Sequence, residues 1–145
     1  MFHRILVGWD CSPGAVAALR AAAAIAIPSG DNARVVALAV LRPVSTESSE
    51  EGAADMAGRR DFAQDTFGMA RDGLDDRSRA WVTLRFAEST DPARAICQYA
   101  DEHAFDLVVL GKHGTGGLLH RRLGRIAETV AKSSRMPVLL TGNQS

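Results

Sequence analysis

The amino-acid sequence predicts one α/β domain: a doubly wound, five-stranded parallel sheet in the order 3-2-1-4-5, with helices on both faces. Three observations lead to this expectation. The 145 residues fit a single compact domain, expected over residues 1–145. Short β-rich runs alternate with helical patterns along the whole chain. Three of these runs are almost wholly apolar, as in strands that are covered on both faces.

Five β-rich runs are expected to form the strands. The first, second and fourth are the apolar ones, whereas the third alternates between apolar and polar residues, which is typical of a half-exposed strand. In chain order the runs are Arg4–Trp9, Val35–Leu41, Trp81–Phe86, Phe105–Leu110 and Pro137–Thr141.

Four helical patterns lie between or after these runs. The first begins at Ser12-Pro13, where Ser can cap a helix and Pro suits its first position, and it stops at Pro28-Ser29-Gly30. The second spans about Ala53 to Leu74, and the polar segment Pro43–Arg60 is expected to be a mobile, solvated loop before it. The third begins at Asp91-Pro92 with the same capping chemistry, and the fourth follows the fourth strand.

Each of the last three helices has an apolar stripe at helical spacing. In the second helix the stripe is Met56, Ala63, Phe67, Ala70 and Leu74. In the third it is Ala93, Ile96, Cys97, Ala100 and Ala104, and in the fourth it is Leu119, Leu123, Ile126, Ala127 and Val130.

The composition argues against several classes of protein. Lysine plus arginine number 17, as do aspartate plus glutamate, and this zero net charge disfavours a protein that coats nucleic acid. Cys11 and Cys97 have no metal-ligand or disulfide spacing, which is typical of reduced thiols in a cytoplasmic protein. No signal peptide is expected at the N-terminus, and the longest apolar segment, Ala21–Ile27, is expected to be too short to span a membrane.

A glycine-rich turn, Gly111–Gly117, directly follows the fourth strand and precedes the fourth helix. Glycines allow consecutive N–H groups to point at one anion, and a helix N-terminus adds a favourable dipole. The turn is therefore expected to bind phosphate, with a flexible surface loop as the alternative. Basic side chains lie close to it in sequence: Lys112, His113, His120, Arg121, Arg122 and Arg125.

The first strand ends at Gly8-Trp9-Asp10, and in the predicted sheet order this end faces the same crevice as the end of the fourth strand. Ligands of open α/β sheets bind at such a point, where the winding direction reverses. Asp10 could accept hydrogen bonds from an adenine amino group or a ribose hydroxyl. Equally, Asp10 could be a turn or helix-cap residue.

Other kinds of site find little support. The sequence lacks the P-loop pattern GxxxxGK[ST], and GxGxxG is absent after the first strand. A phosphoacceptor receiver domain would need an Asp ending the third strand and a Lys ending the fifth, and this chain has neither. A flavin carrier would need its phosphate loop after the first strand, where this chain has none. The histidines have no metal-ligand spacing, so no metal site is expected. No catalytic residue is expected either, since Glu128 is more typical of a solvated helix residue; any nucleotide hydrolysis should be slow or need a partner.

Several groups of residues together match a known pattern. Ile5–Ser12 combines a strand with an acidic turn, and Asp91–Ile96 begins the third helix. Gly111, Gly114 and Gly124 are separated by two and by nine residues. On these features, and on the tail segments Ile126–Val130 and Met136–Leu140, the chain resembles the universal stress protein family over nearly its whole length. The glycine spacing is similar to the G-2x-G-9x-G-[S/T] motif of the family's ATP-binding branch.

The resemblance implies a Rossmann-like fold and a protein of stress response or signalling that binds ATP or another adenine nucleotide, with or without magnesium. It also implies a homodimer formed through the C-terminal strand, whose apolar edge Val138–Thr141 needs a cover. No nucleic-acid or membrane partner is expected. The implied nucleotide-binding residues are Gly8, Trp9, Asp10, Val40, Leu110, Gly111, Gly114, Gly124, Arg125 and Ile126.

Arg125 departs from the family pattern, which has Ser or Thr at this position. Its guanidinium could replace the hydroxyl with a charge-assisted contact to phosphate. It could also fill the pocket and prevent binding, or be an exposed helix arginine. The alternative function is therefore a dimeric stress protein that holds no nucleotide and acts through protein partners.

Overall fold

The structure is a computed structural model that describes residues 2–43, 49–113 and 123–142. Its strands are β1 (Arg4–Gly8), β2 (Arg34–Leu41), β3 (Val82–Glu88), β4 (Leu107–Gly111) and β5 (Val138–Thr141). Its helices are α1 (Pro13–Ala26), the 3-10 helix η1 (Ile27–Asn32), α2 (Ser49–Asp72), α3 (Asp76–Arg79), α4 (Pro92–Glu102) and α5 (Arg125–Ser133).

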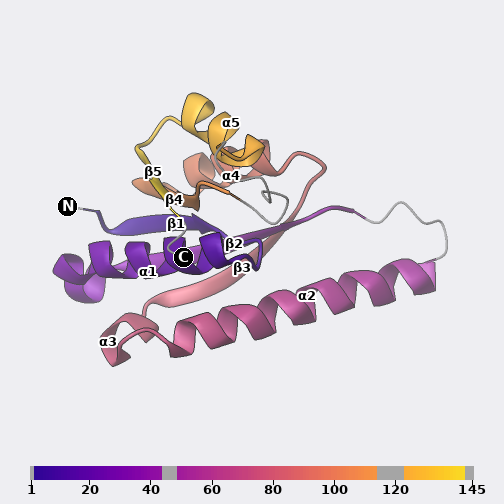
Figure 1. The fold of residues 1–145 in the computed structure, drawn as a ribbon, viewed down its shortest axis with the longest axis horizontal. Helices are drawn as coiled ribbons and strands as arrows, with labels where there is room; N and C mark the ends of the chain where they lie inside the picture. Colours follow the sequence, from indigo (N-terminus) through magenta and orange to yellow (C-terminus); the bar gives the residue numbers. More distant parts are fainter. Residues whose placement is uncertain (1, 44–48, 114–122, 143–145) are drawn as a thin grey trace.

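The strands form one parallel sheet in the order β3-β2-β1-β4-β5, which confirms the predicted fold class (Figure 1). β1 lies at the centre, where its Val7 is paired with Ala37 of β2 and with Val109 of β4. The chain moves outward from β1 through β2 to β3, then returns to the other side of β1 for β4 and β5. The winding therefore reverses between β1 and β4, and a switch point lies at their carboxyl ends.

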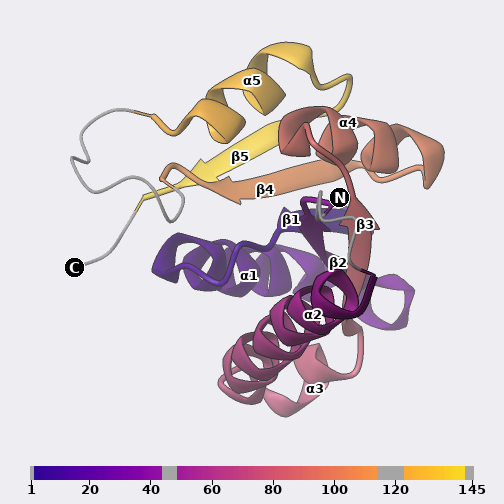
Figure 2. The ribbon, with the colours of Figure 1, turned by 90° about the vertical axis from the view of Figure 1, so that its right-hand side faces the viewer.

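Helices cover both faces of the sheet, α1 and α2 on one and α4 and α5 on the other (Figure 2). Successive strand residues point to opposite faces, so Ile5 and Val7 join the core beneath α1 and α2, whereas Leu6 joins the core beneath α4 and α5. β1 and β4 are buried on both faces, as their apolar runs predict. β3 alternates between buried and exposed positions, also as predicted.

α1 begins with the predicted cap: the N–H of Ala15 donates to Oγ of Ser12 over 3.1 Å, and Pro13 takes the first helical position. Alanines at Ala15, Ala18 and Ala22 are buried against the sheet, so the helix lies close to it. The α-helix ends at Ala26, just before the predicted stop at Pro28-Ser29-Gly30, and the chain continues as the 3-10 helix η1 to Asn32.

The segment Pro13–Asn32 corrects one expectation. Its 20 residues are, by length and composition only, long and apolar enough to cross a membrane. The expectation that every apolar segment is too short was therefore wrong. In this fold the segment forms α1 and η1 of a layered domain, and the buried alanines of α1 pack in the core beside the sheet.

α2 begins at Ser49, so the helix predicted from about Ala53 is confirmed and starts earlier than expected, whereas the expected loop Pro43–Arg60 was wrong for residues 49–60; residues 44–48 lie outside the described part. Glu50 and Glu51 occupy its first turn, where negative charge favours the helix dipole. Of the predicted stripe, Ala63 and Phe67 are buried in the core; Leu74 is buried too, but lies beyond the helix end.

The third and fourth helices also differ in part from the prediction. Asp91 caps α4 as expected, but Ala104 lies after the helix end with a positive φ of 56° and is exposed. α5 begins at Arg125, so Leu123 precedes it, and Ile126 is 41% exposed instead of lying on the buried stripe. Ala127 and Val130 are buried as predicted, and Leu119 lies outside the described residues.

Candidate functional site

The turn that follows β1 is held by its own side chains. The N–H of Trp9 donates to the carbonyl of Leu38 over 2.8 Å, which fixes the end of β1 beside β2. Oδ1 of Asp10 then accepts from the backbone N–H of Ser12 over 3.0 Å and from the Ser12 hydroxyl. Cys11, between them, has a positive φ of 67°, which gives the tight turn into α1. Asp10 is thus a turn residue, as one of its two interpretations required.

The other interpretation of Asp10 is compatible with the same geometry. The carboxylate is exposed, and no described residue donates to Oδ2. Oδ1 organises the turn, while Oδ2 has no donor among the described residues. Asp10 can therefore cap its turn and still accept a hydrogen bond from a ligand.

The end of β4 lies against the first turn of α1. A Cβ on Gly111 would lie 2.9 Å from both the carbonyl carbon and the oxygen of Gly14, which is closer than real Cβ atoms approach backbone. A Cβ on Gly8 would lie 2.5 Å from Cδ2 of Leu110. Glycine at position 111 is thus required by the packing of helix against strand, whether or not a phosphate binds nearby.

The described ends of the connection between β4 and α5 meet. The N–H of Gly124 donates to the carbonyl of Lys112 over 2.6 Å, and the N–H of Lys112 donates to Thr141 of β5 over 2.9 Å. The first and last glycines of the predicted motif are therefore brought to one place at the end of β4. The middle glycine, Gly114, and the basic residues His120, Arg121 and Arg122 lie outside the described residues.

Gly124 is also the N-cap of α5 and offers no side-chain hydrogen bond to the first turn. The N–H groups of that turn consequently point out of the helix without a capping side chain, an arrangement that suits an anion. Arg125, at the first helical position, is exposed, as is Lys112. Nδ1 of His113 is shielded from solvent and has no hydrogen-bond partner among the described residues.

Not every predicted site residue presents its side chain here. Trp9 is buried in the core beneath α2, edge-on to Phe67 with ring centroids 5.7 Å apart. Leu110 is buried in the opposite core beneath α4. These two residues can meet a ligand only through their backbones. Val40 is half-buried near the end of β2, on the α4 side.

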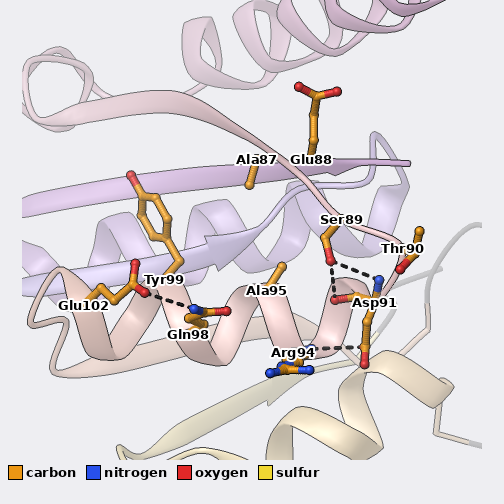
Figure 3. A pocket seen from close by; sticks show the side chains of 10 residues that line it. All are labelled: Ala87, Glu88, Ser89, Thr90, Asp91, Arg94, Ala95, Gln98, Tyr99 and Glu102. Carbon is orange, nitrogen blue, oxygen red and sulfur yellow. Dashed lines mark hydrogen bonds between the residues drawn. The ribbon is translucent and has the colours of Figure 1, made fainter. Parts of the chain in front are cut away.

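A hollow that the sequence did not indicate lies between the end of β3 and α4 (Figure 3). Its volume is about 350 Å³, and none of the predicted nucleotide-binding residues lines it. Much of its polar lining is already hydrogen-bonded: Asp91 accepts from the N–H of Arg94 over 3.2 Å, and Gln98 donates to Glu102 over 3.0 Å. Ser89 and Asp91 fit a helix start equally well, so they gave no separate signal of a hollow.

The cysteines and acidic groups do not form a reactive centre in the described ranges. Burial raises the pKa of the Cys97 thiol above its ordinary 9.0, and the nearby carboxylates of Asp101 and Asp91 raise it further, so the thiol stays protonated and a poor nucleophile. Among residues 2–43, 49–113 and 123–142, no three His, Cys, Asp or Glu side chains gather as metal ligands.

Comparison with known proteins identifies the relatives of this chain. The model of the Universal stress protein family matches residues 1–142. Universal stress protein Rv2623 of Mycobacterium tuberculosis is 29% identical over 136 residues, which are 94% of this chain. The chain spans only 44% of that relative's length.

Solved structures agree with the observed architecture. Universal stress protein UspA from Lactobacillus plantarum superposes with a TM-score of 0.82 at 22% identity, with 96% of this chain and 97% of that chain covered. A universal stress protein solved in complex with cAMP superposes with a TM-score of 0.65 at 26% identity, covering 99% and 98% of the two chains. That relative therefore binds an adenine nucleotide.

Proposed function

Because the chain belongs to the universal stress protein family, we propose that it binds ATP or a related adenine nucleotide where β1 and β4 end. The observation that carries the proposal is the 2.6 Å hydrogen bond from Gly124 to Lys112. This bond brings the N-terminus of α5, which has no side-chain cap, to the end of β4. Asp10, in the turn that follows β1, lies at the same switch point. A relative of the same fold in complex with cAMP supports the class of ligand.

The adenosine part of the nucleotide is assigned to the β1 and β2 side of the crevice. Oδ2 of Asp10 would accept from the adenine amino group or a ribose hydroxyl, while Oδ1 keeps its bond to Ser12. Val40, half-buried near the end of β2, would supply apolar surface for the base. Gly8, Trp9 and Leu110 would take part through their backbones.

The phosphates are assigned to the glycine-rich turn. Gly111, Gly114 and Gly124 would surround them, with Ile126 nearby, and the N–H groups at the start of α5 would donate to them. Exposed Lys112 and Arg125 would neutralise their charge, and Arg125 would take the place of the family's Ser or Thr. Magnesium, if it takes part, would bind through the phosphates, since the described residues offer no cluster of ligands.

The cellular role follows the family: we expect a cytoplasmic stress-response or signalling protein. A homodimer would form along β5, which is the edge strand beside β4 in the described sheet and whose Leu139 is 38% exposed. The competing function, a dimeric stress protein without nucleotide, rests on the departure at Arg125.

Isothermal titration with ATP and magnesium tests the proposal. The sharpest variant is Asp10→Asn, because the amide keeps an oxygen for the turn but replaces the outward acceptor by a donor. We expect ATP affinity to fall by about tenfold or more, the effect of losing one hydrogen bond to a charged group. The matched control, Asp31→Asn, changes an exposed carboxylate on η1 and should leave affinity unchanged. Absence of binding by the unaltered protein at millimolar ATP would refute the proposal.

Arg125→Ala separates the phosphate-contacting interpretation of that residue from the pocket-filling one. If the guanidinium contacts the terminal phosphates, the substitution weakens ATP binding by about tenfold and AMP binding much less. If Arg125 instead fills the pocket, ATP affinity rises when the side chain is removed. That result would favour the competing function, a dimeric stress protein that holds no nucleotide.

A further inference from the structure

The outward side of α2 carries a second apolar stripe that the fold does not use. Phe62 is 60% exposed and Met69 is 76% exposed. They are seven positions apart, or two helical turns, so they lie on one side of the helix. Ala63 and Phe67 already supply the face that packs on the sheet. Figure 1 shows α2 lying along the outside of the domain.

The arginines of α2 turn away from this stripe and toward the body of the domain. Arg60 lies over the ring of Phe86 in β3, 4.9 Å from its centroid. Arg71 donates to the carbonyl of Arg79 over 2.8 Å. Arg59 donates to the carbonyl of Arg42 over 3.1 Å and also pairs with Asp55 over 2.9 Å.

Three carboxylates of the same helix lie on its exposed outer side, beside the apolar stripe. Asp61, Asp65 and Asp72 are exposed, and none of them forms an ion pair with a described residue. Asp65 lies three positions after Phe62 and four before Met69. Asp61 lies four positions before Asp65, and Asp72 lies seven positions after it. These spacings place all five side chains on one outer face of α2.

We propose that this outer face of α2, formed by Phe62, Met69, Asp61, Asp65 and Asp72, docks a basic amphipathic segment of another protein. An apolar stripe beside a row of carboxylates complements a helix that has apolar residues on one side and lysine or arginine at its flanks. A second copy of this chain is a poor occupant, because a symmetric contact would press the same carboxylates together. The surface is separate from the crevice at β1 and β4, so this proposal is independent of nucleotide binding.

The test uses the full chain and two synthetic helical peptides, one of leucine and lysine and one of leucine and glutamate in the same pattern. Calorimetry should show saturable binding of the lysine peptide and none of the glutamate peptide. Amide shifts in ¹H–¹⁵N spectra should cluster on α2. The double variant Phe62→Ser/Met69→Ser should weaken binding by about tenfold or more, and Asp61→Asn/Asp65→Asn should weaken it and flatten its salt dependence.

Ile27→Ser is the matched control, since it alters an exposed apolar residue at the start of η1, outside α2, and it should leave peptide binding unchanged. Thermal melts verify that each variant folds. Lack of binding, equal binding of both peptides, or shifts located elsewhere would overturn the proposal. So would a dimer, seen by sedimentation, that disappears in the Phe62→Ser/Met69→Ser variant.

Discussion

α1 and α2 cover the same face of the sheet but meet it in different ways. α1 approaches so closely that the backbone of Gly14 leaves no room for a Cβ on Gly111. α2 has open space around Gly58 and Gly68, and it reaches the core through the large ring of Phe67. α1 therefore fixes the geometry of the switch point, whereas α2 covers the sheet and presents an outer surface.

The largest expected effect tests whether α2 has one packed side and one open side. Phe67→Ala removes a buried ring that packs on Trp9 and should lower the free energy of unfolding by about 3–5 kcal/mol. Phe62→Ala, on the same helix but exposed, should change it by no more than about 0.5 kcal/mol. Urea denaturation measures both, and similar losses would mean that the two sides of α2 are not distinct.

The close contact of α1 is tested at Gly111. Gly111→Ala places a methyl group against the backbone of Gly14, which cannot move aside as a side chain can. We expect a loss of about 1–3 kcal/mol in the free energy of unfolding, measured in urea. An unchanged midpoint would show that α1 does not hold the end of β4 as closely as described.

The same substitution on α2 should act in the opposite direction. Gly58 lies inside the helix, and an added Cβ would meet nothing within 4 Å. Gly58→Ala should therefore stabilise the protein by about 0.5–1 kcal/mol, because alanine loses less backbone entropy than glycine. Thermal melts followed by circular dichroism measure this, and a lower midpoint than that of the unaltered protein would contradict it.

The smallest effect concerns Asp75, which caps the short α3 after α2. The N–H of Ser78 donates to its Oδ1 over 2.9 Å, and this bond chiefly lowers the pKa of Asp75 below 3.8. A carboxyl whose folded pKa is lowered stabilises the protein above its unfolded pKa and loses this contribution as the pH falls through the folded value. The stability gap between the unaltered protein and Asp75→Ala should thus shrink below about pH 4. A gap that stays constant under acid would show that the charged cap contributes nothing.

Local signals predicted most of the fold. The apolar runs located all five strands within a few residues, and Ser12 and Asp91 marked helix starts because capping involves only neighbouring residues. The first turn of α2, Ser49–Gly52, is polar on every side, so its sequence favours a loop. The helix there projects little apolar surface onto the core, so no stripe was present to detect.

The candidate site was predicted less completely, since its geometry depends on segments far apart in the chain. The need for glycine at position 111 comes from Gly14, which the spacing of the motif does not show. The opposite burial of Trp9 and Leu110 depends on which way each strand end turns its side chains. The exposed stripe on α2 could have been noticed, because Phe62 and Met69 lie off the stripe of Met56, Ala63 and Phe67.

The most direct test of the central claim is a titration of the ¹⁵N-labelled protein with ATP and magnesium, followed by ¹H–¹⁵N spectra. The account predicts saturable shifts confined to the strand ends and the start of α5, at Gly8–Asp10, Val40, Gly111–His113 and Gly124–Ile126. Shifts that cluster instead at the hollow between β3 and α4, or no shifts at millimolar ATP, would contradict it.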